Sequence, residues 1–261
     1  MFRATPEFKR YLSDETELAA MSCKFVNIMG HVSNEPGNCF VYGEYVRGSG
    51  SIVLALCLEQ IGFERFNETS SVFVENVKSK SNLCGGGDAS DKSKVKKERE
   101  TRIPKGVKRY ALLTGDVTDA KFNTMMETMN SYENRHGDLI KVLISSKTGR
   151  DGINVNNVLQ IHLIGPEWNQ SSIYQAMSRG IRATSHDDLI NEEKERLANL
   201  SKEEREQMIK EGKDPNNPLV EIKIYKHVAI PEEGVTSIDL LMYTDSANKD
   251  KKIKRKLIEK W

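Results

Sequence analysis

A glutamine and two arginines in the middle of the chain are spaced so that they could act together on a phosphate. Gln175, Arg179 and Arg182 are four and three residues apart, which on a helix places all three on one face. Ser171 or Ser172 could cap the start of such a helix. A planar guanidinium that stays protonated suits the charge that develops on a transferred γ-phosphoryl group. A solvated basic helix face is the alternative for these three residues taken alone.

A polar loop upstream of these residues could approach phosphates in a different way. The run KVLISS at residues 141–146 is typical of a buried strand, and a glycine-containing loop follows it at residues 147–152. Ligands of open parallel sheets lie beyond the carboxyl ends of strands, where small residues let the backbone come close to phosphates. Donors available at this position are Ser145, Ser146, Lys147 and Thr148. An ordinary strand-to-helix connection is the alternative for this loop alone.

The elements that must position these residues alternate along the chain. Apolar residues at spacings of three and four predict a helix over residues 13–32, and Asp14 with Glu17 offers a start signal. Residues 39–46 predict a strand, and a glycine-bearing turn separates it from an apolar helix over residues 51–61. Further strand-like apolar runs cover residues 72–77, 107–113, 141–145, 158–164 and 220–230. This alternation predicts an α/β fold with a mainly parallel sheet and helices on both faces.

We expect one principal domain over residues 1–235 and a helical C-terminal tail over residues 236–261. Lysine, serine and glycine dominate residues 77–106, which predicts a mobile insertion. Residues 191–217 carry Glu, Lys and Arg at helical spacings and predict an exposed helix and loop. The tail combines apolar residues with many lysines, as amphipathic helices do.

Composition excludes several classes of protein. With 39 Lys and Arg against 38 Asp and Glu, the net charge is +1, so any contact with nucleic acid must come from local patches. The 4 cysteines are far apart, which argues against a disulfide scaffold and favours a reducing compartment. Neither an apolar leader nor a run long enough to span a membrane is apparent, so we expect an intracellular protein without a membrane partner.

The histidines do not predict a metal site. His162 lies in the apolar run VLQIHLIG, and a hydrogen-bonded core histidine is the expected role. The remaining histidines have no partner at the spacing of metal ligands: His31, His136, His186 and His227. We therefore expect no metal ligand among them.

The polar loop and the arginines occur together in one stretch, TGRDGINV followed by PEWNQSSIYQAMSRGIR. This stretch resembles motifs V and VI of superfamily-two helicases, and its sequence is especially similar to that of the Swi/Snf-like branch. Upstream, CFVYGEYVRGSGSIVLALCLEQIGF resembles motif IV of the family. KRYALLTGDVT resembles the next family strand, which ends at Thr114 and Gly115. The resemblance covers roughly two thirds of the chain and leaves residues 77–106 and 191–217 as additions.

One departure from the pattern helps to choose a branch. Chromatin remodellers usually continue motif VI with Gly-Gln, whereas this chain has Ala-Thr-Ser-His at residues 183–186. With its closing segment, the chain is more similar to nucleoside triphosphatases and early-transcription ATPase subunits of poxviruses and other large DNA viruses. The resemblance implies a RecA-like fold of the P-loop NTPase type.

The resemblance also implies roles for individual residues. Arg182 would be the arginine finger, Arg179 its companion on the γ-phosphate, and Gln175 a link between the cleft and both arginines. The residues at the nucleotide edge would be Gly149, Arg150, Asp151 and Gly152. Those nearer the nucleic-acid track would be Ser145, Ser146, Lys147, Thr148, Thr114 and Gly115.

The chain contains neither a G-x-x-x-x-G-K-[ST] loop nor a Walker B box. The groups that grip the β- and γ-phosphates of ATP and its Mg²⁺ would therefore lie in a preceding domain, and we expect the chain alone not to hydrolyse ATP. The implied function is an ATP-dependent helicase or translocase for viral transcription or genome processing. Its implied partners are the DNA or RNA backbone, the N-terminal RecA-like domain of the same protein, and RNA polymerase or transcription factors.

Two other functions stay open at this point. A degenerate helicase lobe could act as a non-catalytic interaction module in a transcription complex, although such a lobe would have no need of a glutamine and two arginines on one face. An unrelated doubly wound nucleotide-binding enzyme is a weaker alternative, because no G-x-G-x-x-G sequence follows a strand. If the protein is viral, we expect it in the cytoplasm of the infected cell and in the virion.

Overall fold

A parallel sheet of six strands forms the centre of the computed structural model, which describes residues 3–48, 50–66, 107–147, 152–231 and 235–258. The strand order is β2-β3-β4-β1-β5-β6, and every neighbouring pair is parallel. The strands are β1 (Asn38–Gly43), β2 (Glu64–Arg65), β3 (Arg109–Leu113), β4 (Val142–Ser146), β5 (Val158–Leu163) and β6 (Lys223–Lys226). The predicted parallel α/β sheet is therefore confirmed.

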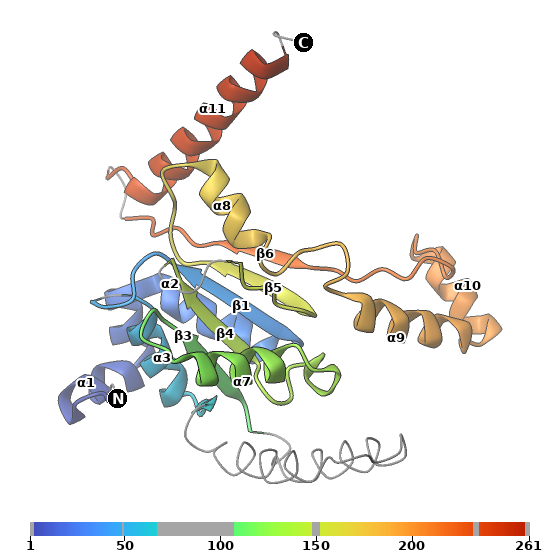
Figure 1. Ribbon diagram of the computed structural model, residues 1–261, viewed down its shortest axis with the longest axis horizontal. Helices are drawn as coiled ribbons and strands as arrows, with labels where there is room; N and C mark the ends of the chain where they lie inside the picture. The colour runs from blue at the N-terminus through green and yellow to red at the C-terminus, as the bar shows by residue number, and fades with distance from the viewer. Residues whose placement is uncertain (1–2, 49, 67–106, 148–151, 232–234, 259–261) are drawn as a thin grey trace.

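Helices cover both faces of this sheet (Figure 1). The first face carries α1 (Pro6–Ser13), α2 (Glu15–Asn34) and α3 (Ser51–Gln60), and the opposite face carries α7 (Asp119–Met129) and α8 (Gln170–Met177). Side chains of each strand alternate between the two layers: Cys39 and Val41 of β1 join the first cluster, and Phe40 and Tyr42 join the second. The chain has the RecA-like arrangement of a doubly covered parallel sheet.

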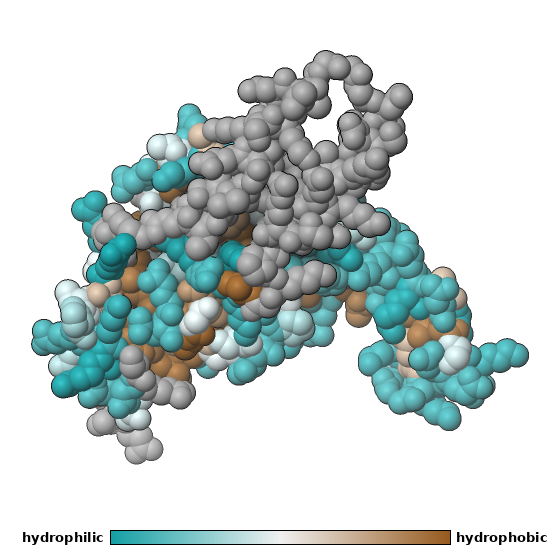
Figure 2. Space-filling model, turned by 90° about the horizontal axis from the view of Figure 1, so that it is seen from below, coloured by the Kyte–Doolittle hydropathy of each residue, from teal (hydrophilic) through white to brown (hydrophobic). Residues whose placement is uncertain are grey.

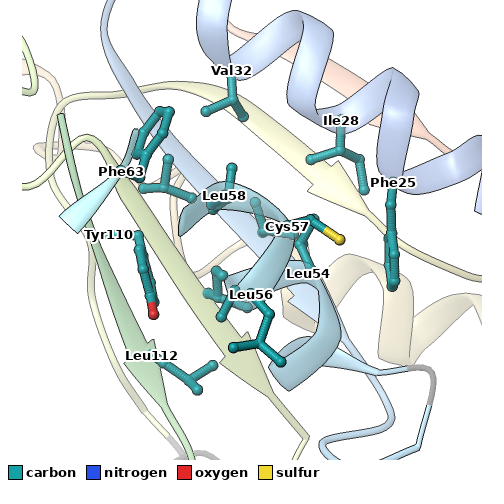
Figure 3. Packing of buried hydrophobic residues seen from close by; sticks show 14 of the residues in the cluster. Phe25, Ile28, Val32, Leu54, Leu56, Cys57, Leu58, Phe63, Tyr110 and Leu112 are labelled. Atoms are coloured by element: carbon teal, nitrogen blue, oxygen red, sulfur yellow. The ribbon is translucent and has the colours of Figure 1, made fainter. Parts of the chain in front are cut away.

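Local signals explain where α2 begins and which of its sides is buried. The side chain of Asp14 caps the helix by accepting hydrogen bonds from the backbone N–H groups of Thr16, at 2.8 Å, and Glu17, at 3.1 Å. Phe25, Ile28 and Val32 then recur every three or four residues and are buried. Figure 3 shows them facing side chains of α3 and β3 that belong to the same hydrophobic cluster.

Two peripheral parts extend from the core. The helices α9 (Asp187–Ala198) and α10 (Lys202–Lys210) form an arm on one side, and α11 (Ile238–Ile258) runs away from the sheet on another (Figure 1). A capping box between Ser201 and Glu204 starts α10, which buries none of its residues. The surface of this arm is mostly hydrophilic in Figure 2. The polar segment at residues 191–217 thus contains the end of α9 and all of α10, so two helices lie where one was expected.

The tail is one long helix that contacts the core near its middle. The hydroxyl of Ser246 in α11 lies 3.4 Å from Oε1 of Gln170 in α8, and the side chain of Lys24 in α2 pairs with Asp239. None of the helices within the described ranges is long and apolar enough to cross a membrane. The expected strand at residues 72–77 and the insertion at residues 77–106 lie outside the described residues.

A chain of hydrogen bonds crosses the β5–β6 edge of the sheet. His227 and His162 are joined between Nε2 and Nδ1 at 3.0 Å, and Nε2 of His162 lies 3.2 Å from Oε1 of Gln160. The amide nitrogen of Gln160 donates to the carbonyl of Pro36 at 3.2 Å. Since the amide oxygen can only accept, Nε2 of His162 carries its proton and Nδ1 accepts from His227. His162 is a hydrogen-bonded core histidine, as its apolar run predicted.

Candidate nucleotide and nucleic-acid interface

Several of the predicted nucleic-acid residues lie together at the carboxyl edge of the sheet. Ser145 of β4 is opposite Tyr42 of β1 and Leu113 of β3, so Thr114 and Gly115 follow directly beside the end of β4. Ser145 and Ser146 are fully buried, however, because β4 is an inner strand with neighbours on both sides. The hydroxyl of Ser145 donates to the carbonyl of Ser146 at 3.4 Å.

The expectation that both serines offer hydroxyls to phosphates is therefore not met in this conformation. Lys147 and Gly115 are exposed and Thr114 is half-buried, so these three form the accessible part of the predicted track. Thr148 lies outside the described residues.

Lys147 is held between two carboxylates at this edge. Its Nζ lies 3.5 Å from Oε1 of Glu44, which follows β1, and 3.6 Å from Oε2 of Glu167, which follows β5. The negative charges of Glu167 and then Glu44 raise the pKa of Lys147 above its usual range. Lys147 therefore stays charged near neutral pH and is directed along the strand ends.

Glu167 links this lysine to the arginine segment. Its carboxylate is almost fully buried and accepts a hydrogen bond from the Tyr42 hydroxyl at 3.3 Å. Burial, with the charge of Glu167 next, raises the pKa of Tyr42 to about 12, so this hydroxyl keeps its proton. The guanidinium carbon of Arg179 lies 5.7 Å from the centre of the Tyr42 ring. Sequence patterns did not predict a role for Tyr42, Glu44 or Glu167, although their positions at or just after strand ends were a usable signal.

The predicted shared helix face for Gln175, Arg179 and Arg182 is wrong. The helix α8 ends at Met177, so Gln175 lies in its last turn and both arginines follow in an irregular segment at residues 178–186. The backbone turns more tightly beyond the helix, because Gly180 N–H bonds to the carbonyl of Met177, three positions back, at 3.1 Å. A helical hydrogen bond would reach four positions back.

The predicted start of this helix also needs correction. The N-cap residue is Asn169, which precedes Ser171 by two residues and Ser172 by three, and it makes no side-chain capping hydrogen bond. Ser171 and Ser172 lie within the helix. A hydroxyl caps the other end, where Ser178 donates to the carbonyl of Gln175 at 2.9 Å.

Tertiary contacts explain why the helix stops. A Cβ built on Gly180 would lie 3.3 Å from Cδ1 of Ile161 in β5, so this glycine lets the backbone approach the strand closely. The carbonyl of Arg179 accepts a hydrogen bond from the N–H of Val155 at 2.9 Å instead of from a helical partner. The arginine segment is thereby attached to residues 152–158, which follow the glycine loop.

Arg182 is exposed, and Arg179 is half-buried. The Nε of Arg182 donates to the carbonyl of Ser178 at 3.3 Å. The terminal nitrogens of the guanidinium take no part in this hydrogen bond. Gly152 adopts a φ of +80° and is the first described residue after the loop. The other residues predicted at the nucleotide edge lie outside the described residues: Gly149, Arg150 and Asp151.

The exposed side chains described here suit an anionic ligand. The ammonium group of Lys147 and the guanidinium of Arg182 can each bind phosphate oxygens, and a guanidinium can do so through two parallel hydrogen bonds. Within the described ranges, no group of three or more His, Cys, Asp or Glu side chains is arranged to hold a metal ion.

Comparison with known proteins gives consistent results. The model of the helicase conserved C-terminal domain matches residues 54–184. The chain is 26% identical to "Putative helicase 087L" of Invertebrate iridescent virus 3 over 219 residues. This aligned region covers 83% of this chain and 17% of that protein. It is 30% identical to the termination factor NPH-I homolog of African swine fever virus over 176 residues. This aligned region covers 66% of this chain and 24% of that protein.

These relatives are proteins of large DNA viruses, and the chain spans less than a third of each of them. Among solved structures, the chain is similar to the C-terminal part of the Fun30 ATPase domain, with a TM-score of 0.41 and 13% identity over 85% of this chain and 44% of that one. The family match includes β3, β4, β5 and α8, which carry or directly precede most of the site residues described above. The chain belongs to the family of helicase conserved C-terminal domains.

Proposed function

We propose that the chain is the C-terminal RecA-like lobe of an ATP-dependent helicase or nucleic-acid translocase that serves viral transcription or genome processing. Residues 1–235 form this lobe, and residues 236–261 form its helical tail. Arg182 acts as the arginine finger, with Arg179 and Gln175 beside it. ATP and Mg²⁺ are held mainly by a second RecA-like lobe, which supplies the P-loop and the acidic box.

The attachment of the arginine segment to the residues after the glycine loop carries this proposal. Val155 N–H bonds to the carbonyl of Arg179, and Arg182 is exposed beside it. An arginine whose backbone is fixed in advance loses little freedom when it meets a phosphate, which is the condition for strong transition-state stabilisation. ATP draws the two lobes together, and hydrolysis lets them part, so that the grip on a strand advances.

The accessible residues at the strand ends support a track for the nucleic-acid backbone. Lys147 supplies a fixed positive charge, and Gly115 with Thr114 supplies a small, polar surface beside it. Contacts to phosphates carry no sequence information, so binding is tolerant of sequence and sensitive to salt.

Replacing Lys147 by alanine is expected to weaken binding of single-stranded DNA or RNA and to reduce the salt dependence of the affinity. Loss of one phosphate contact should lower the slope of log K against log salt by about 0.7. Fluorescence anisotropy titrations of this chain at several salt concentrations measure that slope. Lys210→Ala, which removes an exposed lysine of α10, is the matched control. Identical slopes for Lys147→Ala and the unmodified chain would exclude Lys147 from the track.

The division of labour between lobes has its own test. This chain alone, with or without nucleic acid, is expected to show no ATP hydrolysis above background, whereas the protein that also contains the P-loop lobe hydrolyses ATP. A colorimetric phosphate-release assay measures both. Turnover by the chain alone would refute the assignment of ATP binding to the second lobe.

A second candidate function is docking in a transcription complex, for example on RNA polymerase. The arm formed by α9 and α10 favours it, because α10 buries none of its residues and extends away from the core (Figure 1). A helicase lobe that acted only by docking would not need Arg182. Turnover that is unaffected by loss of this arginine would therefore favour docking over catalysis.

A further inference from the structure

The irregular turn that carries Arg182 is closed by Ser185 and His186, the last two of the four residues at which motif VI departs from the remodeller pattern. Arg182 N–H donates to the hydroxyl oxygen of Ser185 at 3.0 Å, and Ser185 N–H donates back to the carbonyl of Arg182 at 3.1 Å. Only 1% of Ser185 and 6% of His186 is exposed, although Arg182 beside them faces solvent. Buried polar groups at the base of an exposed arginine need an explanation.

His186 connects this turn to the sheet. Its Nε2 lies 2.7 Å from the carbonyl oxygen of Val158, the first residue of β5. A carbonyl can only accept, so Nε2 carries a proton. Nδ1 of His186 lies 2.8 Å from the hydroxyl oxygen of Ser185, which also lies 3.0 Å from the carbonyl oxygen of Arg182. Hydrogen bonds therefore run from the backbone of Arg182 through Ser185 and His186 to β5. We refer to these contacts as the Ser185–His186 bridge.

A second hydrogen bond fixes the same turn from its other side. The carbonyl of Ser185 accepts from Asn157 N–H at 2.7 Å. Asn157 has a left-handed backbone, with φ at 58°, and its side-chain amide donates to Asp188 in α9 at 2.9 Å. Residues 157 and 158 thus hold both the carbonyl of Ser185 and the ring of His186. The turn is thereby attached to the segment that connects the glycine loop to β5.

No helix positions Arg182, because α8 ends at Met177. Fixing its Cα therefore depends on the contacts of the turn itself. A displacement of about 1 Å at a catalytic group can cost about a hundredfold in rate. We propose that Ser185 and His186 are positioning residues, which hold Arg182 where a transferred phosphoryl group develops its charge. This inference rests on the proposed function, in which Arg182 is the arginine finger.

The first test measures the hydrogen bond in this chain. Ser185→Ala removes the acceptor of Arg182 N–H, so the amide of Arg182 is expected to exchange with solvent at least about tenfold faster by NMR-detected hydrogen exchange. Amides of β1 and β4 should keep their protection. Ser171→Ala, an exposed serine on α8, is the matched control. Unchanged exchange at Arg182 would overturn the bridge as the element that fixes the turn.

The second test asks whether the bridge acts through Arg182, in the ATP-hydrolysing protein that contains this lobe. Ser185→Ala and His186→Leu are expected to lower kcat by about tenfold or more, with little change in KM for ATP. His186→Gln keeps one donor and one acceptor and should retain most of the rate. In the background of Arg182→Ala, none of these changes should lower kcat further, because the group that they position is gone.

The outcomes separate this inference from the proposed function. If Arg182→Ala leaves kcat unchanged, the proposed function fails first. If Arg182→Ala lowers kcat but Ser185→Ala and His186→Leu reduce it by the same factor in both backgrounds, the bridge has only a structural role and the inference is overturned. Should His186→Leu fail to fold, Ser185→Ala with the amide-exchange measurement still decides, since it removes a single oxygen atom.

Discussion

Replacing Arg182 by alanine in the ATP-hydrolysing protein is expected to lower kcat by about a thousandfold or more while the affinity for ATP stays nearly intact. In the proposed function the guanidinium acts on charge that develops only as the γ-phosphoryl group is transferred, so its loss should raise the energy of the transition state. The same proposal assigns the binding of ATP and Mg²⁺ mainly to the P-loop lobe, so the affinity for ATP should change little. Steady-state ATPase assays with saturating nucleic acid separate kcat from KM.

Two further variants make this experiment specific. Arg182→Lys keeps the charge but loses the planar fork that can bind two phosphate oxygens, so it should recover only a small part of the rate. Arg196→Ala removes an arginine whose contacts are with Glu193 on the surface of α9, at 2.7 Å, and should leave kcat unchanged. A thousandfold loss in Arg196→Ala, or none in Arg182→Ala, would contradict the assignment.

Acid is expected to destabilise the fold well before carboxylates are protonated. Burial, followed by the charge of His227, lowers the pKa of His162 to about 3, and burial with the charges of His31 and Lys24 lowers the pKa of His227 to about 4. Both rings are therefore neutral in the folded protein near pH 7, whereas in the unfolded chain they take up protons near pH 6.5. Stability is complete above that pH and falls as the pH decreases toward the folded values.

The expected loss is large. A single such group contributes about 1.4 kcal/mol per pH unit within this window, so the pair is expected to lose on the order of a few kcal/mol between about pH 6.5 and pH 4.5. That is a large fraction of the whole stability of many domains. Glu35 faces the same cluster. The hydrogen bond from His31 is the main cause that lowers the pKa of Glu35 to about 2. Lys223 and Tyr225 also donate hydrogen bonds to its carboxylate. Its contribution is lost only below its ordinary pKa of 4.5, so it does not explain a transition at higher pH.

Urea unfolding followed by circular dichroism between pH 8 and pH 4.5 measures this dependence. His227→Gln removes one titrating ring while keeping an N–H donor, so it should roughly halve the slope of stability against pH. His136→Gln is the control, because His136 is exposed and pairs with the carboxylate of Glu192 on the surface, at 2.9 Å. A stability that is flat from pH 7 to pH 5 would refute the account of the buried pair.

The sequence by itself determined the fold class and the family. Regular elements arise from short-range patterns, so the spacing of Phe25, Ile28 and Val32 and the cap at Asp14 were sufficient to predict α2. Continuous apolar runs likewise predicted β1, β4 and β5, because inner strands of a parallel sheet are buried on both faces. The sequence of the motifs indicated the helicase family, and the family match over residues 54–184 confirms this prediction.

Only the tertiary structure decided how the site residues are presented. Spacing alone predicted a continuous helix through Arg182, but the chain exchanges helical hydrogen bonds for contacts with Val155, Asn157 and Val158, which no local pattern encodes. The glycine in MSRGIR was the one local signal of an early end. Burial of Ser145 and Ser146 followed from the neighbours of β4 in the sheet and not from their own side chains.

The same reason applies to the groups that the sequence did not bring together. Tyr42 and Glu167 are 125 residues apart, and His162 and His227 are 65 residues apart, yet each pair shares a hydrogen bond. Helical and strand periodicities act over a few residues, whereas these contacts depend on the order of strands in the sheet. The residue types of the candidate site could therefore be read along the chain, but the positions of its charges were set by packing between distant segments.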